Sequence, residues 1–147
     1  MILYEEFEIK TGGRLDAIDI TDEIVETARA AGVARGSLLV FSPHTTCCVM
    51  FGTNGSRASE MLAREMELIA PSEEYYAHDD LGIRTENLVE DERPNAPAHL
   101  FHMFAGSASA TIPIVDGRVA LGEGQRVLFV ELDCSRLRRY CIQVVGE

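Results

Sequence analysis

The stretch Leu38-Leu39-Val40-Phe41-Ser42-Pro43-His44-Thr45-Thr46-Cys47-Cys48 joins an apolar run to a compact polar group. Its first four residues predict a buried strand, because they form a short run of apolar strand formers. Proline then fixes the backbone ahead of one imidazole and two hydroxyl groups, whereas an ordinary turn favours Gly, Asn or Asp. The stretch therefore indicates a strand that carries polar groups to a site at its tip. A β-bend with a surface histidine is the alternative.

The segments on either side predict a mixture of helices and strands. Helical spacing predicts helices over residues 21–31, 56–69 and 96–104, with Ser56 as a candidate cap of the second. Apolar alternation or short apolar runs predict strands over 2–9, 15–20, 37–41, 47–51, 110–115, 118–121, 125–132 and 138–145, with 47–51 continuing or pairing the strand before it. We therefore expect one compact α+β domain over residues 1–147, with a mostly antiparallel or mixed sheet and two to three helices.

Charge and composition exclude several classes of protein. The formal net charge is −11, and a field of this sign repels nucleic-acid backbones, although a local arginine cluster could still hold a small phosphorylated ligand. The sequence contains no apolar run of about 18 residues, so we expect no membrane span. The first residues lack the basic segment and long apolar core of a signal peptide. We therefore expect a cytoplasmic protein whose four cysteines are reduced.

Three histidines are candidates for chemistry. His44, His78 and His99 come from separate segments, each beside other polar groups. Converging neutral imidazoles bind transition metals, and the same groups can donate and accept protons. A metal-dependent hydrolase that uses all three as ligands is therefore one candidate function. His102 has an apolar helix around it and favours a structural role.

Two arginines and two cysteines also stand out. Arg136 and Arg138 are two residues apart, so an extended chain points them the same way, and guanidinium groups bind phosphate at two points. A solvated turn is the alternative for this pair. Cys47 and Cys48 lie near His44, but no catalytic signature surrounds them, so buried structural thiols are the simpler interpretation.

Taken together, the polar motifs resemble those of a known family, the YjbQ-like family of secondary thiamine-phosphate synthase enzymes. The resemblance covers nearly the whole chain. It rests on motifs in the following order: His44-Thr45-Thr46, Pro71 with Tyr76 and His78, Asn95-x-x-Ala98-His99-Leu100, Gly106-Ser107, Ile112-Pro113-x-x-x-Gly117, Leu121-Gly122-x-x-Gln125, Glu131-x-Asp133 and Arg136-x-Arg138.

The resemblance implies a homotrimer of α+β subunits with a polar cleft at or near the subunit contacts. It also implies a side activity that joins a pyrimidine pyrophosphate to a thiazole phosphate. His44, His99 and Arg136 are the catalytic candidates on this basis. The candidates for holding a phosphorylated ligand are Thr45, Thr46, Arg138 and Gln125. A divalent metal, Mg²⁺ or Zn²⁺, is a candidate cofactor, and the three separate histidines His44, His78 and His99 are its candidate ligands from their residue type.

The chain departs from the family pattern at three places. Gly52-Thr53-Asn54 stands where the family usually has Asn-Glu-Asn, so a carboxylate is missing at position 53. Gly124 replaces an aromatic residue, and Cys134 replaces a glycine. These changes leave three functions open: the synthase, the metal-dependent hydrolase, and a module that binds a phosphorylated metabolite without turning it over.

Overall fold

The strands divide into two antiparallel sheets in the computed structural model, which describes residues 1–53 and 57–147. The five-stranded sheet has the order β1-β8-β3-β5-β6, and the three-stranded sheet has the order β2-β7-β4. The strands are β1 (Ile2–Lys10), β2 (Ala17–Asp19), β3 (Arg35–Phe41), β4 (Cys47–Thr53), β5 (Ser109–Val115), β6 (Arg118–Val119), β7 (Gln125–Glu131) and β8 (Leu137–Gly146). This architecture confirms the predicted α+β class.

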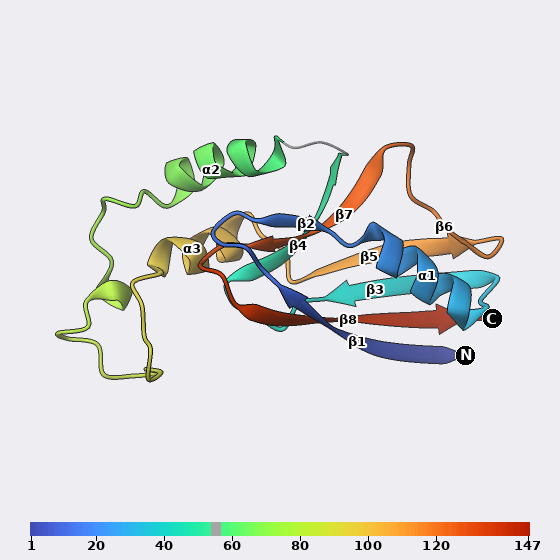
Figure 1. The fold of residues 1–147 in the computed structure, drawn as a ribbon, viewed down its shortest axis with the longest axis horizontal. Helices are drawn as coiled ribbons and strands as arrows, with labels where there is room; N and C mark the ends of the chain where they lie inside the picture. The colour runs from blue at the N-terminus through green and yellow to red at the C-terminus, as the bar shows by residue number, and fades with distance from the viewer. Residues whose placement is uncertain (54–56) are drawn as a thin grey trace.

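Three α-helices and one short 3₁₀ helix complete the described chain. They are α1 (Thr21–Ala31), η1 (Ala77–Asp79), α2 (Ala58–Ile69) and α3 (Ala96–Phe104). Gly32 ends α1 in the left-handed region, with φ of 65°. The proposed capping role of Ser56 lies outside the described residues. Figure 1 shows α1 near the two chain termini, with α2, η1 and α3 gathered at the other end of the molecule.

The opening stretch of the sequence is the crossover between the two sheets. β3 pairs with β5 and β8, whereas β4 pairs with β7. The expectation that 47–51 continues or pairs the preceding strand was therefore wrong. A tight turn normally joins neighbouring strands, but here Ser42-Pro43-His44-Thr45-Thr46 carries the chain from one sheet to the other. Its polar groups consequently lie at the junction of the sheets.

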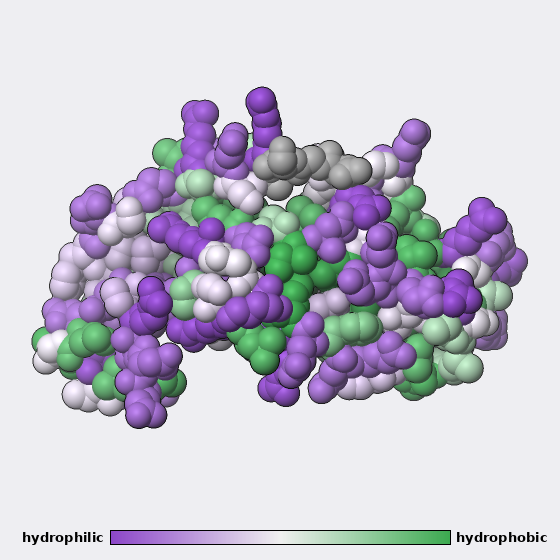
Figure 2. All heavy atoms as spheres, viewed as in Figure 1, coloured by the Kyte–Doolittle hydropathy of each residue, from purple (hydrophilic) through white to green (hydrophobic). Residues whose placement is uncertain are grey.

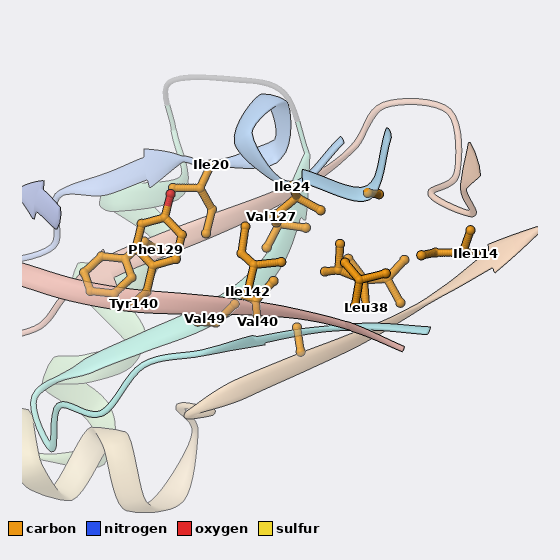
Figure 3. Packing of buried hydrophobic residues seen from close by; sticks show 14 of the residues in the cluster. Ile20, Ile24, Leu38, Val40, Val49, Ile114, Val127, Phe129, Tyr140 and Ile142 are labelled. Atoms are coloured by element: carbon orange, nitrogen blue, oxygen red, sulfur yellow. The ribbon is translucent and has the colours of Figure 1, made fainter. Parts of the chain in front are cut away.

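Two hydrophobic clusters hold the layers together. The first lies between the sheets and beneath α1, and includes Val40, Phe129 and Ile142 (Figure 3). The second covers the other face of the three-stranded sheet with Met66 of α2 and Phe101 of α3. β7 contributes alternate side chains to both clusters, so it is buried on both faces. The strands that lead to the site are thereby held in a fixed position.

The surface is mostly polar but exposes apolar side chains in particular places. Figure 2 shows hydrophilic residues over most of one face, with a hydrophobic area at its middle. The segment between η1 and α3 projects from the body in Figure 1 and exposes apolar side chains, including those of Ile83 and Val89. No helix among the described residues is long and apolar enough to cross a membrane.

Candidate functional site

A pocket of about 890 Å³ lies where the crossover meets η1, the start of α3 and the residues leading into β8. It brings together most of the site residues that the sequence predicts. These are His44, Thr45, Thr46, His78, His99, Arg136 and Arg138. Gln125 is not among the lining residues. It lies at the start of β7, where its Oε1 accepts a hydrogen bond of 3.0 Å from the Gly122 N–H.

Arg138 forms part of the pocket wall and is committed to a buried ion pair. Its Nε and Nη2 donate to the two carboxylate oxygens of Glu131, each at 2.7 Å, and Nη2 also donates to Thr46 Oγ1 at 3.2 Å. Burial alone would lower the pKa of Arg138, but the hydrogen bonds to Glu131 outweigh it and raise that pKa. Arg138 and Thr46 therefore build the site together, and most of their polar atoms are already in use.

Arg136 is the less committed of the two predicted arginines. Its Nε donates to Cys134 Sγ at 3.2 Å, and its Nη2 lies 3.6 Å from Asp133 Oδ2. Its side chain is 35% exposed, against 7% for Arg138. The two guanidinium groups share the pocket, as their spacing predicts, but Arg136 keeps more capacity to meet an incoming anion.

His44 is held by the backbone of β8. The Arg139 N–H donates to His44 Nε2 at 3.0 Å, which places the proton of the neutral ring on Nδ1. Burial, and then the charge of Arg138, lower the pKa of His44 and favour that neutral ring. His44 therefore offers the site an N–H donor, because its other nitrogen is already accepting.

His78 and His99 lie side by side. Their ring centroids are 4.8 Å apart, with the planes tilted by 54°. Burial, and then His78, lower the pKa of His99. Within residues 1–53 and 57–147, however, no group of three His, Cys, Asp or Glu side chains is placed to hold a metal ion. The lone pair of His44 Nε2 is also engaged, so a metal centre of all three histidines stays a prediction.

Sequence reasoning missed Arg84, which organises one wall of the pocket. Its guanidinium donates to the carbonyls of His78, Glu86 and Asn87, and pairs with the Glu92 carboxylate. The segment 83–93 between these contacts supplies much of the pocket lining. The available signal was a lone arginine followed by a run of acidic residues, which is also typical of a solvated loop.

Two departures from the family pattern lie together, outside the residues that line the pocket. Thr53 is the cross-strand partner of Gln125, and Gly124 precedes Gln125 with φ of 73°. The missing carboxylate at position 53 thus belongs to the far end of β4, while Asn54 lies outside the described residues. Cys134, in contrast, contacts Arg136 and so borders the site.

The fold and the pocket define a two-sheet α+β protein with a histidine- and arginine-lined cavity. A family model described as UPF0047 protein YjbQ-like matches residues 5–147, and the chain belongs to this family. A UPF0047 protein of Archaeoglobus fulgidus is 33% identical over 140 residues, covering 95% of this chain and 99% of the relative. One from Methanothermobacter thermautotrophicus is 31% identical over 143 residues, covering 97% and 92%.

Solved structures show the same fold. A YbjQ-like protein of unknown function from Sulfolobus solfataricus superposes with a TM-score of 0.85 at 24% identity, covering 100% of this chain and 99% of that one. A hypothetical protein from Aeropyrum pernix superposes with a TM-score of 0.78 at 33% identity, covering 99% of each chain. These likenesses confirm the predicted family and fold, and they assign no activity.

Proposed function

We propose that the pocket binds a small phosphorylated metabolite and that the protein, as a side activity, joins a pyrimidine pyrophosphate to a thiazole phosphate. The observation that carries the proposal is the concentration of arginines and histidines at one cavity of a chain with net charge −11. Four arginines line it: Arg84, Arg93, Arg136 and Arg138. Glu92 and Glu131 pair with Arg84 and Arg138, so the anion is expected to meet Arg136, whose side chain is 35% exposed, rather than a net positive field.

The proposed joining of the two substrates needs little covalent chemistry from the protein. The thiazole nitrogen attacks the carbon that bears the pyrophosphate, a C–N bond forms, and the C–O bond breaks with its electron pair leaving on pyrophosphate. Arg136, His44 and Thr45 line the pocket, and in this proposal the guanidinium, the imidazole N–H and the hydroxyl would stabilise the charge that develops on the leaving pyrophosphate. A divalent metal, when bound, would neutralise further charge on the leaving group.

Replacing Arg136 with alanine tests the proposal. We expect the affinity for inorganic pyrophosphate to fall at least about 30-fold, because a charge-assisted bidentate contact is lost where little else compensates. Isothermal titration calorimetry measures the affinity, and circular dichroism checks that the fold is intact. Arg118→Ala, on the exposed strand β6, is the matched control and should bind as the parent does.

Three results separate the alternative functions. Equal affinity in the Arg136→Ala variant would contradict the proposed binding site. Binding of both synthase substrates without formation of thiamine phosphate would favour the non-catalytic binding module. Release of phosphate from a phosphorylated compound, dependent on added Zn²⁺, would favour the metal-dependent hydrolase.

We further infer that the protein assembles as a homotrimer, as the family resemblance implies. The outer face of the five-stranded sheet supports an interface, because it exposes Ile2, Tyr4, Phe41 and Val145 while the inner face packs into the core. Light scattering coupled to size exclusion should give three times the 16.2 kDa mass of the chain. A mass equal to one chain at micromolar concentration would refute the inference.

A further inference from the structure

A second cavity, a groove of about 460 Å³, lies between strand β1 and helix α1. We call it the α1 groove, and its lining residues are Glu5, Phe7, Asp22, Glu23, Glu26, Thr27 and Ala30. It shares no lining residue with the pocket that holds His44 and Arg136. Figure 1 shows α1 near the two chain termini, whereas η1 and α3, which border that pocket, lie at the other end of the molecule. The α1 groove is therefore a separate cavity.

The periodicity of the two elements explains how these side chains come to share one groove. On β1, Glu5 and Phe7 are two residues apart and are half-buried, so both face the side of the sheet that α1 covers. On α1, the lining residues recur every three or four positions and form one stripe. The homotrimer inferred above uses the opposite face of the sheet, so it leaves the α1 groove open.

The negative charge of the groove is only partly neutralised. Asp22 Oδ1 lies 3.4 Å from an arginine Nη2, and Glu26 Oε2 accepts a hydrogen bond of 3.0 Å from an arginine Nε. Glu5 and Glu23 form no ion pair with another described residue. None of the described residues that line the groove is a Lys, Arg or His. Two carboxylates, one from each wall, are therefore left without a counter-charge.

Glu5 is the more unusual of these two residues. Acids in the first turn of a helix meet the positive end of its dipole, so Glu23 is stabilised there without any ligand. Glu5 instead lies half-buried on β1 between Leu3 and Phe7, which pack against the core. Its carboxylate loses part of its hydration and gains no partner within the described chain. A cation in the groove would supply that partner.

Thr27 is a second and independent indication of a ligand. It is only 4% exposed, yet it lines the groove, and its hydroxyl makes no hydrogen bond to another described residue. Buried polar groups normally have a partner. The surface beside it is apolar, because the Phe7 ring stacks on Tyr140 of the core, with centroids 5.1 Å and planes 11° apart (Figure 3). The groove thus combines unpaired carboxylates, a free hydroxyl and an aromatic surface.

We propose that the α1 groove binds a linear aliphatic diamine in its doubly charged form. One ammonium group meets Glu5, the other meets Glu23, and the Thr27 hydroxyl accepts a further N–H. The methylene chain lies against Phe7 and Ala30. A metal ion would bring charge without apolar surface, and a monoamine would leave one carboxylate without a partner. This binding is independent of the phosphorylated ligand, since the two cavities have no residue in common.

Nuclear magnetic resonance titration of the whole chain with cadaverine, pentylamine and Mg²⁺ tests the proposal. Cadaverine should bind with a Kd of about 1 mM or below and should shift the side-chain signals of Phe7, Thr27 and Ala30. Pentylamine should bind about fivefold more weakly, because it lacks the second contact between an ammonium and a carboxylate. Mg²⁺ should shift signals of exposed carboxylates and leave those of the Phe7 ring in place.

Four variants assign the binding to these side chains. Glu5→Gln and Glu23→Gln should each weaken cadaverine about fivefold and remove its advantage over pentylamine. Glu8→Gln makes the same change of charge at an exposed position of the same strand, and its affinity should stay within about twofold of the parent. Thr27→Val should weaken cadaverine about threefold without lowering the denaturant midpoint, because the free protein has no hydrogen bond to lose there.

Several results would overturn the proposal. Equal weakening in Glu8→Gln, or equal affinity for cadaverine and pentylamine, would mean that an acidic chain simply attracts cations. If no probe shifted the Phe7 signals, Glu5 would be only an inward-facing charge that discourages pairing at the edge strand β1. Tighter binding of tetralysine, with shifts along the β1 backbone, would replace the diamine with an added peptide strand. None of these results depends on whether Arg136 binds pyrophosphate.

Discussion

Replacing Glu131 with glutamine should lower the free energy of unfolding by about 3–5 kcal/mol, the usual cost of removing one partner from a buried ion pair. Glu131 is 0% exposed. Its carboxylate accepts from the Arg138 guanidinium, the Thr11 hydroxyl, the Cys47 thiol and the Asp133 N–H. Glutamine keeps the shape but leaves the Arg138 charge uncompensated, and its amide hydrogens face groups that are themselves donors. Denaturant unfolding measures the change.

Two further variants show that the effect belongs to the buried charge. Glu123→Gln makes the same chemical change in an exposed turn and should alter stability by less than about 0.5 kcal/mol. Replacing Glu131 and Arg138 together with methionine removes both charges and should recover much of the lost stability. A double variant as unstable as Glu131→Gln would contradict this account of the pair.

The recovered double variant should still bind pyrophosphate poorly. Arg138 lines the pocket and donates to Thr46 Oγ1, and the next residue along β8 holds His44 through its backbone N–H. The ion pair therefore shapes the site as well as the core. Stability and ligand affinity are expected to separate in this variant, because methionine can replace the packing of Arg138 but cannot replace its hydrogen bonds.

Local patterns in the sequence predicted the helices and strands. These patterns contain no information on how the strands are divided between the two sheets. The helix over 96–104 was predicted with its observed bounds, and alternation placed the strand at β1. The separation of β3 from β4 was missed, since the residues of β8 and β7 that pair with the two strands lie 72 to 110 positions further along the chain. Such long-range pairing leaves no periodic trace in a short segment.

The sequence predicted which residues lie at the site better than it predicted what each of them does there. His44 and Arg136 were singled out from their polar surroundings and from family motifs, and both line the pocket. The ion pair between Arg138 and Glu131 could not be predicted, because the folded structure determines which charged side chains become neighbours. The same holds for Asp79, whose hydrogen bonds from Asn95 and Ala96 reach sixteen and seventeen residues along the chain.

The second large effect concerns the adjacent thiols of Cys47 and Cys48. We expect a disulfide reagent such as Ellman's reagent to label Cys47 and Cys48 only after unfolding. In the native protein it should label Cys134, and also Cys141 in a subunit whose outer sheet face is uncovered. Both adjacent side chains are 0% exposed, while the other two are partly exposed. The reaction time course at pH 8, with and without guanidinium, counts the thiols in each class.

The physical cause is that the reactive species is the thiolate. Burial raises the pKa of Cys48 to about 12 and raises that of Cys47 as well, where the Glu131 carboxylate adds repulsion. At pH 8 the native thiolate population of Cys48 is therefore about a thousandfold below that of an ordinary thiol, for which the pKa is about 8.5. Restricted access slows the reaction further.

The control for the assay is the double variant Cys134→Ser with Cys141→Ser, which should show no rapid labelling while native and two labelled thiols when unfolded. Rapid labelling of a third thiol in the parent protein would make Cys47 or Cys48 a candidate nucleophile again. If both are protected, neither is the nucleophile of the site. Since Cys47 donates its S–H toward Glu131, it belongs to the buried network behind the pocket, whereas the imidazoles, Thr45 and Arg136 line the pocket itself.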